Sequence, residues 1–426
     1  MSKSSEPQGA HVAGQTDRAS GTAHNLRDVR YLSLFSGAGG LESPHHEPVL
    51  CCELDPVCRV VLGRRFPEAQ LHDDVTTLRG RRVPRVDLVT GGWPCQDLSV
   101  AGTQQGLEGG RSGLFFELLR VAREARATTI VAENVPNLLT LDGERTFRRV
   151  LEALAAAGFN TVAWRTMNAR SFGLPHQRRR VFIMASKDPS IPPRLHRRLR
   201  AIDAEPQRSD AGEVAGFYTT AGLQSICFSV GYVPTLKVGS GLAIPSPPGV
   251  YFDGCVRKAS DAECLRLQGF DPADFEDVAS KDRYRMAGNA VAVPVGRFAM
   301  ESIAADEAPA AIEIGAWRIG PHGMFDEGVL TSLEETFVPG PARNLADFVD
   351  LDDRVPLSAR AAAGLLTRLD RSGKPCPEEL WQALLTAAGD EYSGAREPIS
   401  RRIVGADGRG DAEPEPGVAE PGLALF

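Results

Sequence analysis

Short apolar runs alternate with amphipathic segments along the first 186 residues. The apolar spacing over 113–126 and over 147–157 is that of helices with one buried face, and Gly158 ends the second of them. Strands that alternate with helices form a mostly parallel sheet, so the pattern predicts an α/β fold with a doubly wound sheet. The runs expected to be its strands are 29–35, 49–53, 86–90, 130–132, 161–167 and 180–185.

The character of the sequence changes after residue 186. From 187 to 258 Pro, Gly and Arg become frequent and helical periodicity fades, which predicts a small, mostly β or irregular insert. The helix–strand pattern returns over 259–305, so we expect this stretch to close the domain that begins at 29. An acidic extension follows over 306–389, with helices predicted at 358–369 and 377–388. The end segments 1–28 and 390–426 are rich in small and polar residues and predict disordered tails.

Charge is distributed unevenly along the chain. The 426 residues carry a net charge of −7, which by itself argues weakly against a nucleic-acid partner. However, 170–258 contain 13 Lys and Arg against 6 Asp and Glu, whereas 301–426 contain 11 against 23. An acidic carboxyl-terminal part therefore masks a basic middle, which is either a solvated surface or a surface for an anionic partner.

Cysteine spacing and hydropathy exclude several classes of protein. No two of the eight cysteines have the C-x-x-C spacing of a zinc site, so we expect reduced thiols and no metal. No apolar run approaches the roughly 18 residues of a membrane span, and the first residues have no signal-peptide core. These features predict a cytoplasmic protein that has no membrane partner.

A glycine-rich turn follows the first predicted strand. Its G-x-G-G spacing, within Ser36 to Gly40, lets the backbone approach a ligand closely. Glu53 ends the next strand and could accept both hydroxyls of a ribose, and Asp74 could receive an adenine amino group. Tight turns with solvated acids are the alternative, but the three features together favour an adenosine-containing cofactor.

A second turn carries Cys95 directly after Gly91-Gly92-Trp93-Pro94. A single cysteine is more often a buried structural residue, but a thiol on a Gly/Pro turn at the carboxyl edge of such a sheet is placed as a nucleophile. Glu133 ends the next strand. It could hydrogen-bond a polar heterocycle and donate a proton if partial burial raises its pKa, whereas the alternative is a solvated or capping carboxylate.

Two arginines, Arg178 and Arg180, precede the apolar residues 181–183 and share one face by strand alternation. Arginines that enter an apolar strand are costly unless they pair with anions. A phosphate or an active-site carboxylate would serve, and a solvated strand entry is the alternative.

Taken in order, these motifs resemble those of the bacterial cytosine-5 DNA methyltransferases over about 31–300. The resemblance implies a Rossmann-like methyltransferase domain over 29–186 and 259–305, a target-recognition domain over 187–258, and a helical extension at 306–389. Each motif alone is suggestive, whereas the ordered set is highly specific. The matching segments are the cofactor loop at 31–41, the nucleophile loop at 91–99 with its flank at 102–114, the E-N-V at 133–135, the Q-x-R-x-R strand at 175–183, the helix at 257–270 and the closing G-N-[SA]-V at 287–291.

The resemblance implies a reaction and assigns residues to it. S-adenosylmethionine would methylate carbon 5 of a cytosine flipped out of double-stranded DNA, after the Cys95 thiolate has added to carbon 6. Glu133 would stabilise protonation of the adjacent ring nitrogen, while Arg178 and Arg180 would position the base and that carboxylate. The implied DNA contacts are Gln96, Ser99, Thr235 and Arg257. The implied cofactor contacts are Phe35, Ser36, Gly37, Ala38, Gly39, Gly40, Glu53, Leu54, Asp74, Val75, Gly91, Pro94, Asn289, Ala290 and Val291.

The chain departs from the family pattern at two places. His176 stands where glutamine is more usual, and Val49 follows Leu41 so closely that an ordinary crossover helix does not fit between them. The acidic extension is absent from minimal members of the family, and docking to a partner or to the catalytic domain is a hypothesis for it. Expected partners beyond DNA are a restriction enzyme or the subunits of a phage-defence system, at the nucleoid.

Three other functions remain open at this stage. The first is methylation of tRNA, although that branch of the family usually has P-P-C where this chain has Trp93-Pro94-Cys95. The second is a non-catalytic DNA-binding relative. The third is a nicotinamide-dependent oxidoreductase, which the glycine turn permits but which leaves Cys95, Glu133 and the arginine strand unexplained.

Overall fold

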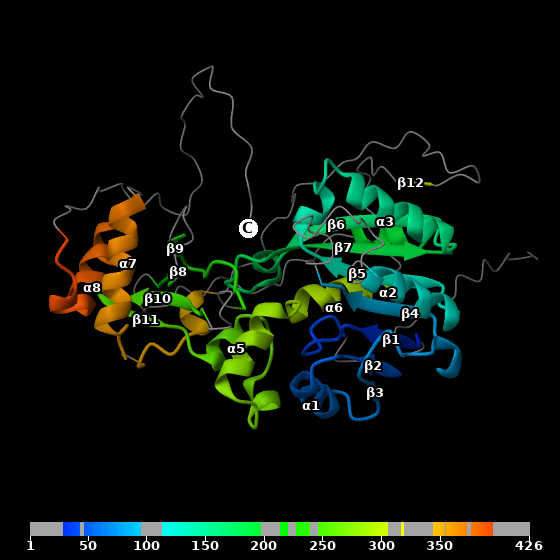
Figure 1. Ribbon diagram of the computed structural model, residues 1–426, viewed down its shortest axis with the longest axis horizontal. Coiled ribbons are helices and arrows are strands. Elements are labelled where there is room, and N and C mark those ends of the chain that lie inside the picture. Colours follow the sequence, from blue (N-terminus) through cyan, green and yellow to red (C-terminus); the bar gives the residue numbers. More distant parts are fainter. Residues whose placement is uncertain are drawn as a thin grey trace, which may run out of the picture.

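The architecture comes from a computed structural model that describes residues 29–42, 47–94, 113–196, 214–219, 227–238, 246–305, 317–318, 344–353, 355–372 and 376–394. A large sheet with helices around it forms one lobe, and a small sheet with two helices forms the other (Figure 1). The tail predicted at 1–28 and most of the one predicted at 390–426 lie outside the described residues.

The large sheet has eight strands in the order β12-β6-β7-β5-β4-β1-β2-β3. The five strands from β5 to β3 run parallel, which confirms the doubly wound arrangement. β7 is antiparallel to both of its neighbours, β5 and β6, so its first residues lie beside the last residues of β5. The strands are β1 Tyr31–Leu34, β2 Leu50–Cys52, β3 Gln70–His72, β4 Leu88–Gly92, β5 Thr129–Asn134, β6 Thr161–Asn168, β7 Arg179–Ser186 and β12 Trp317–Arg318.

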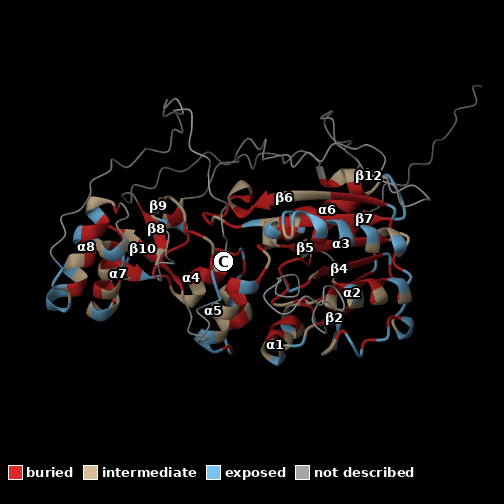
Figure 2. Cartoon of the chain, turned by 45° about the horizontal axis from the view of Figure 1, so that its top comes forward, coloured by how far each residue is buried: buried red, intermediate tan, exposed pale blue. Residues whose placement is uncertain are grey.

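Alternate residues of the central strands enter two separate cores. Leu32, Val89 and Ile130 pack in one apolar cluster with α2 Gly113–Glu124 and α3 Arg145–Ala156. Tyr31 and Leu88, which point to the opposite face, pack in the other cluster with residues of α1 Pro56–Arg65 and α6 Val293–Glu301. The buried interiors of the strands stand out between the helical layers in Figure 2. Helices therefore cover both faces, as the alternating pattern predicts.

Residues 259–305 return to the domain of the large sheet and contribute α6 to one of its two helical layers. α4 Asp261–Arg266 begins with a capping box in which Ser260 and Glu263 satisfy each other's backbone amides. Beyond it, Gln268 is fully buried and donates to the carbonyls of Ala287 and Ala290 at 2.5 and 3.3 Å. These bonds tie α4 to the end of α5 Ser280–Asn289 and so fix the segment that enters the site.

The small lobe holds an antiparallel sheet in the order β11-β10-β8-β9. Its strands are β8 Ala215–Tyr218, β9 Ser229–Val230, β10 Pro248–Phe252 and β11 Cys255–Lys258, all within the predicted insert. The two helices predicted in the extension are α7 Ala359–Ser372 and α8 Glu378–Ala388. Short 3-10 helices lie at Gly80–Arg82, Pro136–Leu139, Ala169–Phe172, Pro192–His196, Pro272–Phe275, Ser302–Ala304, Leu345–Asp347 and Gly389–Glu391.

The two helices of the extension, α7 and α8, pack on the small sheet, whereas β12 of the extension pairs with β6 of the large sheet (Figures 1 and 2). Apolar side chains of α7 and α8 enclose Phe217 of β8 and Val256 of β11 in one cluster. The Leu357 amide donates to the Val256 carbonyl at 2.8 Å, and Arg368 donates to the Thr219 carbonyl at 3.2 Å. The α7–α8 pair and the predicted insert therefore share one hydrophobic core, whereas Leu345, Phe348 and Val349 of the extension belong to the cluster that contains residues of α1 and α6.

Candidate active site

A cavity of about 540 Å³ opens at the carboxyl ends of β1, β2, β4 and β5. Ligands bind at this edge in open parallel sheets. The cavity collects most of the predicted cofactor residues together with Glu133, Arg178 and Arg180. The cofactor residues that line it are Phe35, Ser36, Gly37, Ala38, Gly40, Glu53, Leu54, Asp74, Val75, Pro94, Asn289, Ala290 and Val291.

Two predicted cofactor residues do not line the cavity. Gly39 packs against the ring of Phe66. A Cβ at Gly91 would lie 2.8 Å from the Leu34 carbonyl oxygen, so this glycine permits close pairing of β4 with β1. Gly39 and Gly91 therefore serve packing within the domain, and their contact with the cofactor stays a prediction.

Glu53 is held in place by the backbone on both sides of the cavity. One carboxylate oxygen accepts from the Gly37 amide at 2.7 Å, and the other accepts from the Asp55 amide at 2.9 Å. Each carboxylate oxygen has a second lone pair, so the group can still accept from a ligand. The glycine turn and the end of β2 are thus locked together around an acid that faces the cavity.

The cavity is more open around Asp74 and Leu54. Asp74 accepts from the amide and the hydroxyl of Thr76, both at 2.8 Å, and these bonds hold the pKa of Asp74 below its usual value. Leu54 lines the cavity with 72% of its surface exposed, which is unusual for a large apolar residue. An exposed leucine beside an anchored aspartate suits a flat, partly apolar group such as a purine.

Glu133 and Arg180 form an ion pair at the inner end of the cavity, with Nε and Oε1 3.1 Å apart. Their side chains are 12% and 18% exposed. Burial raises the pKa of the Glu133 carboxyl, and the charges of Arg180 and Arg178 oppose this shift only in part. Arg178 is buried and donates to the Asn289 carbonyl at 3.4 Å and the Leu236 carbonyl at 3.5 Å. A carboxyl that retains its proton more readily than usual therefore lies between two guanidinium groups.

The strand ends around Glu133 are fitted closely to one another. Gly92 is the sheet partner of Glu133, and a Cβ there would lie 3.0 Å from Glu133 Oε2. Asn134 donates to the Trp93 carbonyl at 3.1 Å, and the Trp93 ring packs on Phe115 of α2 with centroids 5.0 Å apart. The segment that leads into Cys95 is thus anchored beside Glu133.

Cys95, Gln96 and Ser99 lie outside the described residues, so their assignments remain predictions. Thr235 is described, and its hydroxyl donates to the Gln177 carbonyl at 2.5 Å, beside the start of β7. Pro94, the last described residue before Cys95, is exposed and lines the cavity.

Arg257 does not lie where it could contact DNA. It is 1% exposed and donates to both carboxylate oxygens of Glu263 at 2.8 and 2.9 Å, to the Asp350 carbonyl at 2.7 Å and to the Lys258 carbonyl at 3.0 Å. The prediction of a DNA contact is wrong for this residue. It joins β11, α4 and the beginning of the extension.

The sequence profile described as "C-5 cytosine-specific DNA methylase" matches residues 29–214 and 244–305. The chain belongs to this family. "Type II methyltransferase M2.BsuMI" of Bacillus subtilis (strain 168) is 34% identical over 370 residues, 80% of this chain and 94% of that protein. "Type II methyltransferase M.Bsp6I" of Bacillus sp. (strain RFL6) is 29% identical over 65% of this chain and 98% of that protein. The solved structure of Entamoeba histolytica methyltransferase EhMeth matches 65% of this chain and 97% of its own, with 14% identity and a TM-score of 0.46.

This cytosine-5 DNA methyltransferase uses S-adenosylmethionine as its methyl donor, and the cavity fits that molecule chemically. Its volume is within the roughly 300–1,000 Å³ of small-molecule sites. It offers Glu53 and Asp74 to hydroxyl and amino groups, and Phe35, Leu54 and Val291 to apolar surface. Within the ranges that the structure describes, no group of three His, Cys, Asp or Glu residues could hold a metal, and no helix is long and apolar enough to cross a membrane.

The methyltransferase cavity also contains residues that sequence reasoning missed. Arg285 of α5 lines it, forms an ion pair with Asp55 and contacts Asp282 at 3.0 Å. Asp55 also caps α1 by accepting from the Val57 amide at 2.8 Å. The signals available in the sequence were Asp55-Pro56, a helix start, and the position of Arg285 four residues before Asn289, one helical turn away.

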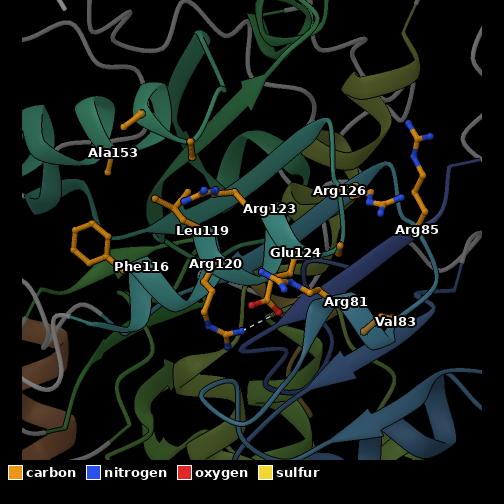
Figure 3. Close-up of a pocket in the computed structure, with 13 residues that line it drawn as sticks. Arg81, Val83, Arg85, Phe116, Leu119, Arg120, Arg123, Glu124, Arg126 and Ala153 are labelled. Carbon is orange, nitrogen blue, oxygen red and sulfur yellow. Dashed lines mark ion pairs between the residues drawn. The ribbon is translucent and has the colours of Figure 1, made fainter.

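A second and larger hollow of about 960 Å³ lies at the opposite edge of the methyltransferase sheet (Figure 3). It is formed by α2, the end of α3 and the segment before β4. In Figure 3 the apolar residues Phe116, Leu119 and Ala153 lie toward the left of the hollow, and Arg81, Arg85 and Arg126 lie toward the right. Because it begins at the amino-terminal ends of β4 and β5, it takes no part in the cavity that holds Glu133. The arginines that line it are Arg81, Arg85, Arg120, Arg123 and Arg126.

Proposed function

We propose that the chain methylates carbon 5 of cytosine within one specific double-stranded DNA sequence, by base flipping and covalent catalysis at Cys95. The single observation that carries this proposal is Glu133, a carboxyl of raised pKa that is paired with Arg180 and lies against the strand leading into Cys95. The carboxyl of Glu133, the guanidinium groups of Arg178 and Arg180, and the residues that precede Cys95 line one cavity, into which we propose that the flipped base enters.

Each residue has a distinct part in the proposed reaction. The Cys95 thiolate adds to carbon 6 of the ring, and Glu133 supplies a proton to the adjacent ring nitrogen. The resulting enamine makes carbon 5 nucleophilic, and S-adenosylmethionine supplies the methyl group that this carbon takes up. Loss of the carbon 5 proton to solvent, departure of the Cys95 sulfur as a thiolate and return of the ring-nitrogen proton to Glu133 then restore the aromatic ring. Arg178 and Arg180 hold Glu133 and the base in position, and their positive charge favours a thiolate nearby.

The cofactor assignments follow from the same cavity. We propose that Glu53 accepts the ribose hydroxyls and Asp74 the adenine amino group, with Phe35 and Val291 against the apolar surface of the ligand. Thr235, with Gln96 and Ser99 of the undescribed turn, is proposed to reach the DNA. A restriction-modification role, with a restriction enzyme or defence subunits as partners, is supported by the relatives named as Type II methyltransferases.

The deciding experiment offers purified protein tritiated S-adenosylmethionine with plasmid DNA and, separately, with bulk tRNA. Transfer to DNA alone, followed by bisulfite mapping to one repeated sequence, is the expected result. Transfer to tRNA alone would replace the proposal by RNA methylation. If no methyl group is transferred to either nucleic acid, although calorimetry shows that the cofactor binds, the protein would instead be a non-catalytic relative.

The nucleophile is tested on DNA that contains 5-fluorocytosine, because a fluorine at carbon 5 cannot leave as a proton does. Wild type should form a complex that survives SDS only when S-adenosylmethionine is present. Cys95→Ser should form none while it binds S-adenosylhomocysteine as wild type does. A stable adduct with Cys95→Ser would refute the assignment.

A further inference from the structure

Two segments that come from different lobes run side by side next to the cavity. Residues 175–178 lead into β7, and residues 233–236 follow β9. The Val233 amide donates to the Pro175 carbonyl at 2.8 Å, and the Gln177 amide donates to the Val233 carbonyl at 2.9 Å. Backbone pairing at this point therefore joins the small lobe to the lobe that contains the large sheet.

The side chain of His176 accepts a hydrogen bond from a backbone amide across this junction. Its Nε2 accepts from the Leu236 amide at 3.0 Å. The His176 ring is fully buried, and burial together with the charges of Arg178 and Arg180 keeps its pKa well below the usual value. The imidazole is therefore neutral, with its proton on Nδ1 and Nε2 free to accept. Since Leu236 is itself 5% exposed, its amide would have no water to replace this acceptor.

The segment that His176 holds lies against residues that line the cavity. Its Leu236 carbonyl accepts from Arg178, which also donates to Asn289, and both of these residues line the cavity. Farther along, the Val238 amide lies 2.8 Å from where a Cβ at Gly288 would be, so 236–238 lie directly against α5. A shift of this segment would move Thr235, the proposed DNA contact, relative to Glu133.

We propose that His176 is a positioning residue for the target DNA, which acts by fixing residues 233–238 through the Leu236 amide. The inference rests on the proposed function. This role also explains why histidine can stand at position 176, where glutamine is more usual in the family, because the side-chain amide oxygen of glutamine can accept the same hydrogen bond.

The test compares His176→Leu, which has no acceptor, with His176→Gln, which retains one. In His176→Leu the Leu236 amide should exchange with deuterium at least tenfold faster, and the KM for DNA should rise about tenfold. The kcat at saturating DNA and the affinity for S-adenosylhomocysteine should stay within about twofold. His176→Gln should restore both the protection and the KM.

A matched control separates positioning from general loss of stability. Thr129→Val removes another buried hydrogen bond, to Ser186 at 3.1 Å, at the opposite edge of the sheet. It should lower the melting temperature without changing the KM for DNA. If His176→Leu does not fold, a tenfold rise of KM in His176→Gln would by itself overturn the proposal.

Other outcomes are equally clear. An unchanged KM for DNA in His176→Leu, or a parallel loss of S-adenosylhomocysteine affinity, would overturn the role of His176 alone. Wild type that methylates no DNA would instead overturn the proposed function, and with it any role of His176 in placing DNA.

Discussion

Removal of the Arg257 side chain should weaken folding of the small lobe and not DNA binding itself. Arg257 and Glu263 are each 1% exposed, and the carboxylate also accepts from the Asp350 amide at 2.6 Å and the Ser260 amide at 2.7 Å. Arg257→Met would leave that carboxylate buried without its cation. Loss of one partner of a buried ion pair costs about 3–5 kcal/mol, a large part of the ~5–15 kcal/mol that stabilises a typical domain.

Urea unfolding measures this loss directly. Trp381 of α8 is 3% exposed within the core of the small lobe, so its fluorescence reports unfolding there once the other three tryptophans are replaced by phenylalanine. Lys258→Met is the matched control, because it removes a neighbouring but exposed positive charge and should change stability by no more than about 0.5 kcal/mol.

The effect of Arg257→Met should also depend on pH. Burial alone would raise the pKa of Glu263, but the bonds from Arg257 and from the two amides outweigh it and hold the pKa below its usual value. The stabilisation is therefore complete above the ordinary carboxyl pKa and is lost as the pH falls through the lowered one. An unchanged unfolding midpoint together with weaker, less salt-dependent DNA binding would refute the reasoning and restore Arg257 as a phosphate contact.

Three further predictions concern the cavity. Glu133→Gln should lower kcat about 10²–10⁴-fold. Wild-type kcat should fall at alkaline pH, because Glu133 loses its proton as the pH rises through its raised pKa, and Glu133→Gln should not show this fall. A mutant pH profile that keeps the fall would assign it to another group. Gly92→Ala should displace the Glu133 carboxylate and reduce kcat about 10²-fold. The affinity for S-adenosylhomocysteine, measured by calorimetry, should stay normal. A normal kcat would contradict the close approach of Gly92 to Glu133. Arg285→Ala removes the ion pair that holds Asp55, whose amide donates to Glu53. The KM for S-adenosylmethionine should therefore rise several-fold at constant kcat. The control variant Arg283→Ala should leave that KM unchanged.

The central sheet could be predicted because its strands carry apolar residues on both faces. The edge strand β3 could not be predicted from apolar residues, because it consists of Gln70, Leu71 and His72, which are exposed or half-buried. The reversal of β7 leaves no mark in its composition. That reversal nevertheless decides the site, because it brings Arg180 at the start of one strand against Glu133 at the end of another.

Arg257 shows where local reasoning about charge fails. A basic residue next to Lys258 in a basic region is equally compatible with a phosphate contact and with a buried ion pair. Nothing local indicated that Asp350, 93 residues later, would close over the pair formed by Arg257 and Glu263. The partner of a buried charge is set by tertiary packing, which the sequence pattern does not contain.

Because the insert at 187–258 is predicted to recognise the target DNA, the shared core of the small sheet and the α7–α8 pair sets the boundaries of any exchange of specificity between enzymes. A graft of 187–258 alone would carry Phe217 and Val256 into a new host without the helices that cover them. The two helices left behind would at the same time expose Leu366, Leu380 and Trp381, each buried in this chain. The transferable module is therefore discontinuous, and a chimera that recognises a new DNA sequence should take 344–394 from the same parent as the strands.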